Sequence, residues 1–191
     1  MTLRLIKTAA RIEASDEFHE ARLLLLLNAA GGRAEQPRPV DGIMKVAKMD
    51  FLLRYPNCLQ RAIAAIKDAD VPRFVKAAQI PEEQMNTIEG QMIRYRFGPW
   101  DKRYRRWLSI LGAKKLATVH KEGRTIKVQL TIRGRELANE LADLPEFVPI
   151  VERARLVVGA VGYMPATRLK DFIYQTFPEI VGMSLGETIN L

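Results

Sequence analysis

GPWDKRYRRWLSILGAKKLATVHKEGRTIKVQL, residues 98–130, changes its hydrophobic period halfway along. The first half carries large apolar side chains at the spacing of one helix face, namely Tyr104, Trp107, Leu108 and Leu111. Pro99 suits the first position of a helix, and Gly112 suits the position that ends one. The sequence therefore predicts a helix over residues 99–112, preceded by a short strand over residues 91–97.

The second half predicts a β-hairpin over residues 115–131. Its second strand alternates apolar with polar side chains, as a strand with one buried face does, and the apolar positions are Ile126, Val128 and Leu130. Glu122-Gly123 supplies the turn, and Thr131 can cap a following helix. Basic helix, hairpin and helix follow one another in the order of a winged helix-turn-helix, in which the hairpin is the wing.

Three further helices are predicted upstream. Ser15 can cap the first, and the five leucines of Leu23–Leu27 leave so little room for a polar face that this helix is expected at the centre of the fold. Asp41 can cap a second helix over residues 42–54. Pro56 separates it from a third, because the residue before a proline avoids helical angles.

The sequence thus predicts a mainly α protein with a small β-wing, an α+β fold in two parts. Residues 1–144 are expected to form a winged-helix domain with a helical insertion at about 57–90. Pro145 and Pro149 mark a linker, and residues 145–191 are expected to form a C-terminal helical hairpin and a tail.

Positive charge is concentrated around the predicted wing. Residues 91–135 hold 13 Lys/Arg and 2 Asp/Glu, a net charge of +11, whereas the whole chain has a net charge of +8 and the remaining residues therefore one of −3. A focused basic segment on an otherwise near-neutral chain is typical of a surface that meets a polyanion.

Nine basic residues of this segment are candidates for contact with double-stranded DNA, since Lys and Arg side chains suit phosphate oxygens. They are Lys102, Arg103, Arg105, Arg106, Lys114, Lys115, Lys121, Arg124 and Lys127. The alternative is ordinary solvated charge. We expect the double substitution Arg103→Glu/Arg106→Glu to abolish DNA contact without unfolding the chain. Sequence-specific contact is not expected, because the helix over residues 42–54 lacks the Asn, Gln and Arg array that reads base edges.

Aromatic residues of the C-terminal part have two interpretations, packing within the chain and a partner-binding surface. They are Phe172, Tyr174 and Phe177. On the basic helix, the helical spacing of Tyr104 and Trp107 favours core positions over stacking on bases.

The residue inventory argues against several classes of function. One cysteine, Cys58, permits no disulfide within the chain, and the two histidines, His19 and His120, are too few for a structural zinc site of the usual kind. Neither a phosphate-binding glycine loop nor a nucleophile–base pattern is recognisable, so we expect no enzyme and no cofactor. The longest apolar run, Leu23–Leu27, is far shorter than the ~20 residues that span a bilayer, and a cytoplasmic protein is expected.

Several segments resemble a known group of proteins. YRFGPW (95–100), with the basic helix, the wing and LTIRG (130–134), is similar to winged-helix proteins of bacterial defence and toxin control. KVAKMDFLLRYP (45–56) and LKDFIYQTFPE (169–179) together resemble the middle components of ABC-three-component and Lamassu-type antiphage systems. This resemblance implies an accessory subunit that bridges an SMC-like ABC ATPase and an effector, often a nuclease, and couples DNA sensing to effector release.

Two other functions stay open. A free-standing winged-helix transcription regulator would form a homodimer through the C-terminal hairpin and bind a defined operator tightly. A protein adaptor would instead pair its basic surface with an acidic partner, and a direct assay with duplex DNA separates this function from DNA binding.

Overall fold

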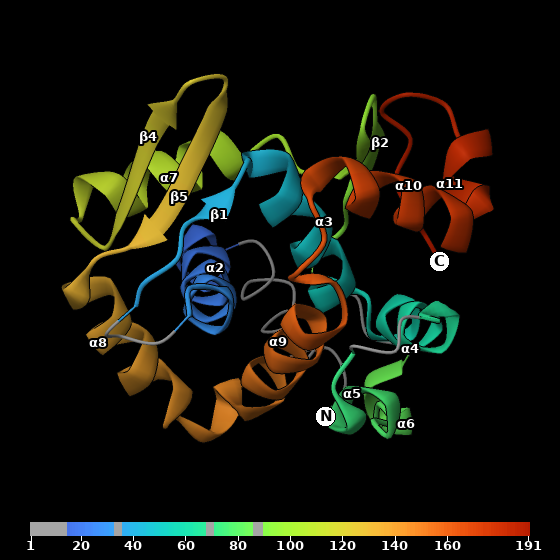
Figure 1. The fold of residues 1–191 in the computed structure, drawn as a ribbon, viewed down its shortest axis with the longest axis horizontal. Coiled ribbons are helices and arrows are strands. Elements are labelled where there is room, and N and C mark those ends of the chain that lie inside the picture. Colours follow the sequence, from blue (N-terminus) through green and yellow to red (C-terminus); the bar gives the residue numbers. More distant parts are fainter. Residues whose placement is uncertain (1–14, 33–35, 68–70, 86–89) are drawn as a thin grey trace, which may run out of the picture.

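The structure, a computed structural model, describes residues 15–32, 36–67, 71–85 and 90–191. These ranges form a mainly helical α+β fold with ten α-helices and two small antiparallel sheets (Figure 1). Within them, no helix combines the length and the apolar character that crossing a membrane requires.

Helix α2 (Asp16–Ala30) lies at the centre of the fold. The Ser15 hydroxyl oxygen accepts a hydrogen bond from the backbone amide of Phe18, which caps the helix as predicted. Leu23–Leu27 are all buried, because α2 packs against four helices, α3 (Ile43–Arg54), α7 (Tyr104–Ala113), α8 (Ile132–Ala142) and α9 (Val148–Val161). The prediction of a central helix without a polar face is confirmed.

The larger sheet contains the predicted hairpin. Strands β4 (Ala117–Glu122) and β5 (Thr125–Leu130) pair antiparallel, and β1 (Val40–Asp41) adds to the other edge of β5, so the strand order is β1-β5-β4. Val128 and Leu130 are buried, as their alternation with polar residues predicted, whereas Ile126, the third position of that pattern, remains 37% exposed. In Figure 1 the hairpin projects at the upper left, on the side of the molecule opposite the short helices α5 (Arg73–Lys76) and α6 (Glu82–Met85).

The basic helix begins later than predicted. Helix α7 spans Tyr104–Ala113, whereas Gly98–Trp100 forms strand β3, paired with β2 (Ile93–Tyr95). Gly98 has a φ of 116°, a conformation that glycine adopts far more readily than other residues, and it lets the chain reverse into this second hairpin. Pro99 therefore lies in a strand and does not open the helix, so the prediction of a helix from residue 99 is wrong at its N-terminus.

Helices α3 (Ile43–Arg54) and α4 (Pro56–Ala65) are separated at Pro56, as predicted. Asp41 does not cap α3, because it lies in β1, where its carboxylate pairs with the Lys127 ammonium at 2.7 Å. The N-cap residue is Gly42, which offers no side chain for a capping hydrogen bond.

Two short helices follow within the predicted insertion, α5 (Arg73–Lys76) and α6 (Glu82–Met85). Both pack against α4. Residues 68–70 and 86–89 of the insertion lie outside the described residues.

Helix α8 (Ile132–Ala142) begins at the predicted cap, where the Thr131 hydroxyl accepts a hydrogen bond from the amide of Gly134. The predicted linker is helical. A 3₁₀ turn, η1 (Pro145–Phe147), leads directly into α9 (Val148–Val161), in which a proline occupies the first turn, where its missing N–H costs nothing. Helix α9 then packs along α2 and α3.

Helix α10 (Ala166–Thr176) packs against α3 and α4, and a short α11 (Pro178–Gly182) follows it. The last residues are ordered against the chain. The amide of Ile189 donates to the carbonyl of Met92, the Tyr55 hydroxyl donates to the carbonyl of Ile189 at 3.0 Å, and the Ile189 side chain is buried.

Candidate nucleic-acid interface

Helix α7 separates aromatic from basic side chains. Tyr104 and Trp107 are fully buried towards α2 and α3, which confirms that they are core residues. Arg105 and Arg106 lie on the exposed side of the same helix, and Lys102 is exposed in the turn before it. The helix therefore presents its cations to solvent.

Four of the nine candidate cations pair with carboxylates of this chain. The pairs are Arg103–Asp101 (2.9 Å), Arg106–Asp16 (2.8 Å), Lys114–Glu20 (2.6 Å) and Lys127–Asp41 (2.7 Å). Two of these pairs join α7 and its C-terminal end to the first two turns of α2, and Asp16 lies in the first turn, where acidic side chains are favoured by the helix dipole. These four cations are partly neutralised within the fold.

The other five candidates form no ion pair with any residue in the described ranges. They are Lys102, Arg105, Lys115, Lys121 and Arg124, and all five side chains are exposed. Glu122 is the one acidic residue in the hairpin sequence from residue 117 to residue 130. The surface formed by α7 and the hairpin therefore carries positive charge that the described residues do not balance.

A groove of about 860 Å³ lies between α7 and the hairpin. Arg105 lines it from α7, and Arg124 lines it from the hairpin turn. Its apolar lining comes from four elements and includes Ile43, Met44, Leu108, Val119 and Ile126. We call it the α7–hairpin groove. No local sequence signal marks it, because it depends on how α7 and the hairpin pack together.

A buried charge network joins α2, α3 and α7 beneath this surface. Asp50 accepts hydrogen bonds from Arg22 Nε and Arg54 Nε, both at 2.8 Å, and all three side chains are fully buried. The Tyr104 hydroxyl donates to Asp50 at 2.6 Å, and Arg54 Nη1 donates to Asp101 at 3.0 Å. Burial alone would raise the pKa of Asp50, but the charges of Arg22 and Arg54 outweigh it and hold the pKa well below its usual range.

This network was not predicted from the sequence, although one sequence signal pointed to it. Asp50 lies on the same helical side as Val46, where a carboxylate requires a buried partner. Arg103, a candidate for DNA contact, belongs to the network, because it bonds Asp101 twice and lies over the Trp107 ring at 4.7 Å from its centroid. Glu at position 103 would therefore disturb the core, so it does not test DNA contact cleanly.

His19 and Cys58 are both buried, and burial shifts the pKa of each towards its neutral form. Burial and the nearby Arg22 lower the pKa of His19 to about 3, and Arg22 Nη1 lies 2.6 Å from its Nδ1. Burial raises the pKa of the Cys58 thiol to about 12. Among the described residues, no three His, Cys, Asp or Glu side chains gather where they could hold a metal ion.

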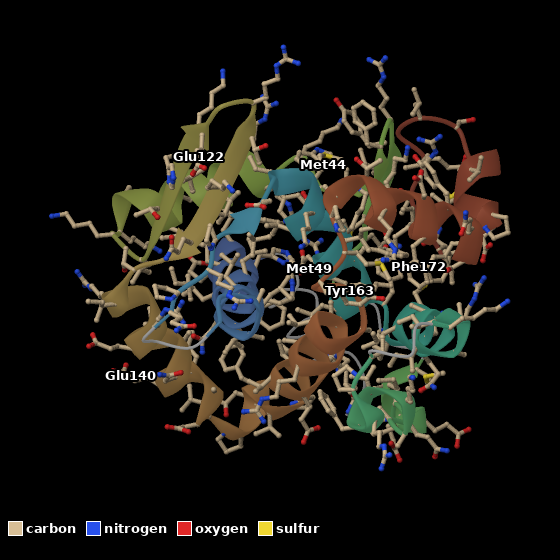
Figure 2. All side chains as sticks on the ribbon, in the orientation of Figure 1. Met44, Met49, Glu122, Glu140, Tyr163 and Phe172 are labelled. Carbon is tan, nitrogen blue, oxygen red and sulfur yellow. The ribbon has the colours of Figure 1, made fainter. Side chains whose placement is uncertain are left out.

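The three candidate partner-binding aromatics occupy different environments. Phe177 is buried and packs edge-to-face on Phe51, with 5.6 Å between ring centroids, as the packing interpretation expects. Phe172 and Tyr174 are half-buried on α10. Figure 2 shows Phe172 beside α10, well away from the hairpin that carries Glu122.

Comparison of the chain with protein-family models, with curated proteins and with solved structures found no match.

Proposed function

We propose that this chain is a non-catalytic protein that contacts the backbone of double-stranded DNA through α7 and the β4–β5 hairpin. The observation that carries the proposal is the set of five exposed cations on this surface that form no ion pair with the described residues. Cations placed in this way release counterions when they meet phosphates, which is the main source of sequence-independent affinity for DNA.

The order of the elements supports a winged-helix interpretation. Helix α2, strand β1 and helix α3 come first, α7 and the β4–β5 hairpin follow, and β1 pairs with β5. A winged helix has this order when residues 55–103 are treated as an insertion between its second and third helices. In this interpretation α7 is the recognition helix and the hairpin is the wing.

The side chains of α7 supply cations for phosphate contact but no amide side chain that reads adenine. Its sequence, YRRWLSILGA, has no Asn or Gln, the residues that pair with adenine in the major groove. Its exposed polar positions are Arg105, Arg106 and Ser109. Position along the duplex would then be set by phosphate contacts, which carry no sequence information directly.

The proposed role in a larger complex rests on the resemblance of residues 45–56 and 169–179 to middle components of antiphage systems. On that basis we propose an accessory subunit that bridges an SMC-like ABC ATPase and an effector nuclease. A tagged pull-down from the native host, with nuclease treatment and mass spectrometry, should recover both partners. An ATPase–effector complex that assembles and responds to DNA without this chain would refute the bridging role.

Fluorescence anisotropy with the purified chain and two unrelated duplexes of about 20 base pairs tests the DNA contact. We expect similar affinity for both duplexes. Roughly a thousandfold preference for one sequence would instead indicate a transcription regulator. No binding to either duplex would contradict the proposal and favour an adaptor for an acidic protein.

A further inference from the structure

The α7–hairpin groove has an apolar lining that DNA contact leaves unused. Val119 and Ile126 lie on the face of the hairpin that also holds the buried Val128, but beyond the core, so they remain 39% and 37% exposed. Leu108 on α7 and Met44 on α3 line the same groove. Figure 2 shows Met44 on the side of the molecule from which the hairpin projects, whereas Glu140 on α8 lies on the opposite side.

The charged groups around this lining are positive. Arg105 and Arg124 line the groove from two sides, and neither forms an ion pair with a residue in the described ranges. The acidic side chain in the lining, Asp41, is held by the Lys127 ammonium at 2.7 Å. The groove therefore combines an apolar surface with two cations that lack a counter-charge there.

The start of α3 adds to the positive potential. Gly42 provides no side-chain cap, and its own amide donates to the carbonyl of Ile126 at 2.7 Å, which ties the hairpin to α3. The amides of Ile43 and Met44 find no acceptor among the described residues, and both residues line the groove. The N-terminus of a helix favours negative charge, in agreement with the two arginines.

We infer that the α7–hairpin groove binds an acidic amphipathic segment of a partner polypeptide. Apolar side chains of the segment cover Val119, Ile126, Met44 and Leu108. Its carboxylates pair with Arg105 and Arg124. The inference goes beyond the proposed DNA contact, because it assigns a protein ligand to the apolar lining, while Arg105 and Arg124 can serve either ligand.

Two alternatives fit the groove less well. A phosphate backbone pairs with the arginines but gains nothing from exposed aliphatic side chains, whose burial is the main source of affinity in helix-in-groove recognition. A small amphipathic anion that pairs with the arginines would leave Val119 and Ile126, 39% and 37% exposed, partly in water. A segment with an extended apolar face covers both.

Phage display tests the inference without knowledge of the partner. The probe is a random dodecapeptide library, selected on the immobilised full chain, and enriched peptides are then synthesised with a fluorescent label. Binding is measured to the wild-type chain, to Val119→Ser/Ile126→Ser, to Arg105→Glu/Arg124→Glu and to Lys102→Glu. Lys102 carries the same charge near α7 but lies outside the groove lining, so it is the matched control.

We expect enriched peptides that combine Asp or Glu with large apolar residues. The serine variant should weaken them roughly tenfold through lost apolar burial, and leave duplex binding within about twofold, since it removes no charge. The arginine variant should weaken both ligands, whereas Lys102→Glu should weaken the duplex alone. Circular dichroism checks that each variant is folded. We expect the serine variant to fold, because the side chains of Val119 and Ile126 are exposed.

Three results would overturn the inference. The first is that the selection enriches no peptides that combine acidic with large apolar residues. The second is enriched acidic peptides that bind the serine variant as tightly as wild type, since they would recognise charge alone. The third is peptides that bind the Arg105→Glu/Arg124→Glu variant unchanged. Because duplex binding is measured in parallel, failure of the peptide site and failure of the DNA contact are distinguishable.

Discussion

Asp50→Asn tests the buried charge network most severely, because it removes one negative charge and almost no volume. Asp50 accepts four hydrogen bonds, from Arg22 Nε (2.8 Å), Arg22 Nη2 (3.2 Å), Arg54 Nε (2.8 Å) and the Tyr104 hydroxyl (2.6 Å). An amide retains one acceptor oxygen and turns its NH₂ group towards donors. The buried Arg22 would then lose its carboxylate partner and keep its contact with His19, whereas the buried Arg54 would keep the carboxylate of Asp101.

Removing one partner of a buried pair typically costs about 3–5 kcal/mol, because the other charge stays buried without compensation. We therefore expect Asp50→Asn to lower the free energy of unfolding by about 4 kcal/mol, a large fraction of the 5–15 kcal/mol usual for a domain. Urea denaturation followed by circular dichroism measures it. The matched control is Asp171→Asn, whose pair with Lys170 (3.0 Å) is largely exposed, and which should cost less than about 1 kcal/mol.

The same substitution has a pH signature. The folded state holds the pKa of Asp50 below its unfolded value, so the stability that Asp50 contributes is complete above about pH 4 and is lost as the pH falls further. Asp50→Asn should flatten the acid limb of the stability curve. A loss below about 1 kcal/mol at pH 7, with an unchanged acid limb, would refute the account of the network.

Two further substitutions test the packing. Lys48 is buried, and its ammonium donates to the carbonyl of Met44 at 3.1 Å; burial, followed by the charge of Lys170, lowers its pKa to about 8. Lys48→Met should therefore raise the free energy of unfolding by about 2–3 kcal/mol at pH 7, and this gain should shrink as the pH rises from 8 towards 10.5. An unchanged or reduced stability in urea denaturation would contradict this prediction. Gly134→Ala places a Cβ 1.9 Å from the carbonyl oxygen of Leu116 and should cost roughly 2 kcal/mol or more in thermal unfolding, whereas Gly182→Ala, with no atom within 4 Å, should change stability by less than about 0.5 kcal/mol.

Local patterns account for the parts of the fold that the sequence analysis predicted. The caps at Ser15 and Thr131, the hairpin alternation and the break at Pro56 each depend on side chains within a few residues. The start of α7 depends on strand pairing between β2 and β3, and the helical pattern of residues 99–112 concealed it.

The candidate site was predicted only in part, because ion pairing is decided by the tertiary fold. Arg106 and Arg105 are equivalent in the sequence, but α2 brings Asp16 to Arg106 and leaves Arg105 at the groove. The partners in the buried network lie 28 and 47 residues apart along the chain, in the pairs Arg22–Asp50 and Arg54–Asp101. No periodicity in the sequence encodes such contacts.

The salt dependence of duplex binding tests the central claim most directly. Each neutralised phosphate lowers the logarithm of the binding constant by about 0.9 per decade of salt, so five free cations predict a slope of about −4 to −5. Arg105→Glu/Arg124→Glu should weaken binding and reduce this slope by about 2. Arg73→Glu/Arg155→Glu, on α5 and α9, changes the net charge equally at exposed sites and should leave the slope unchanged. Equal affinities and slopes for both variants would show that the α7–hairpin surface does not contact DNA.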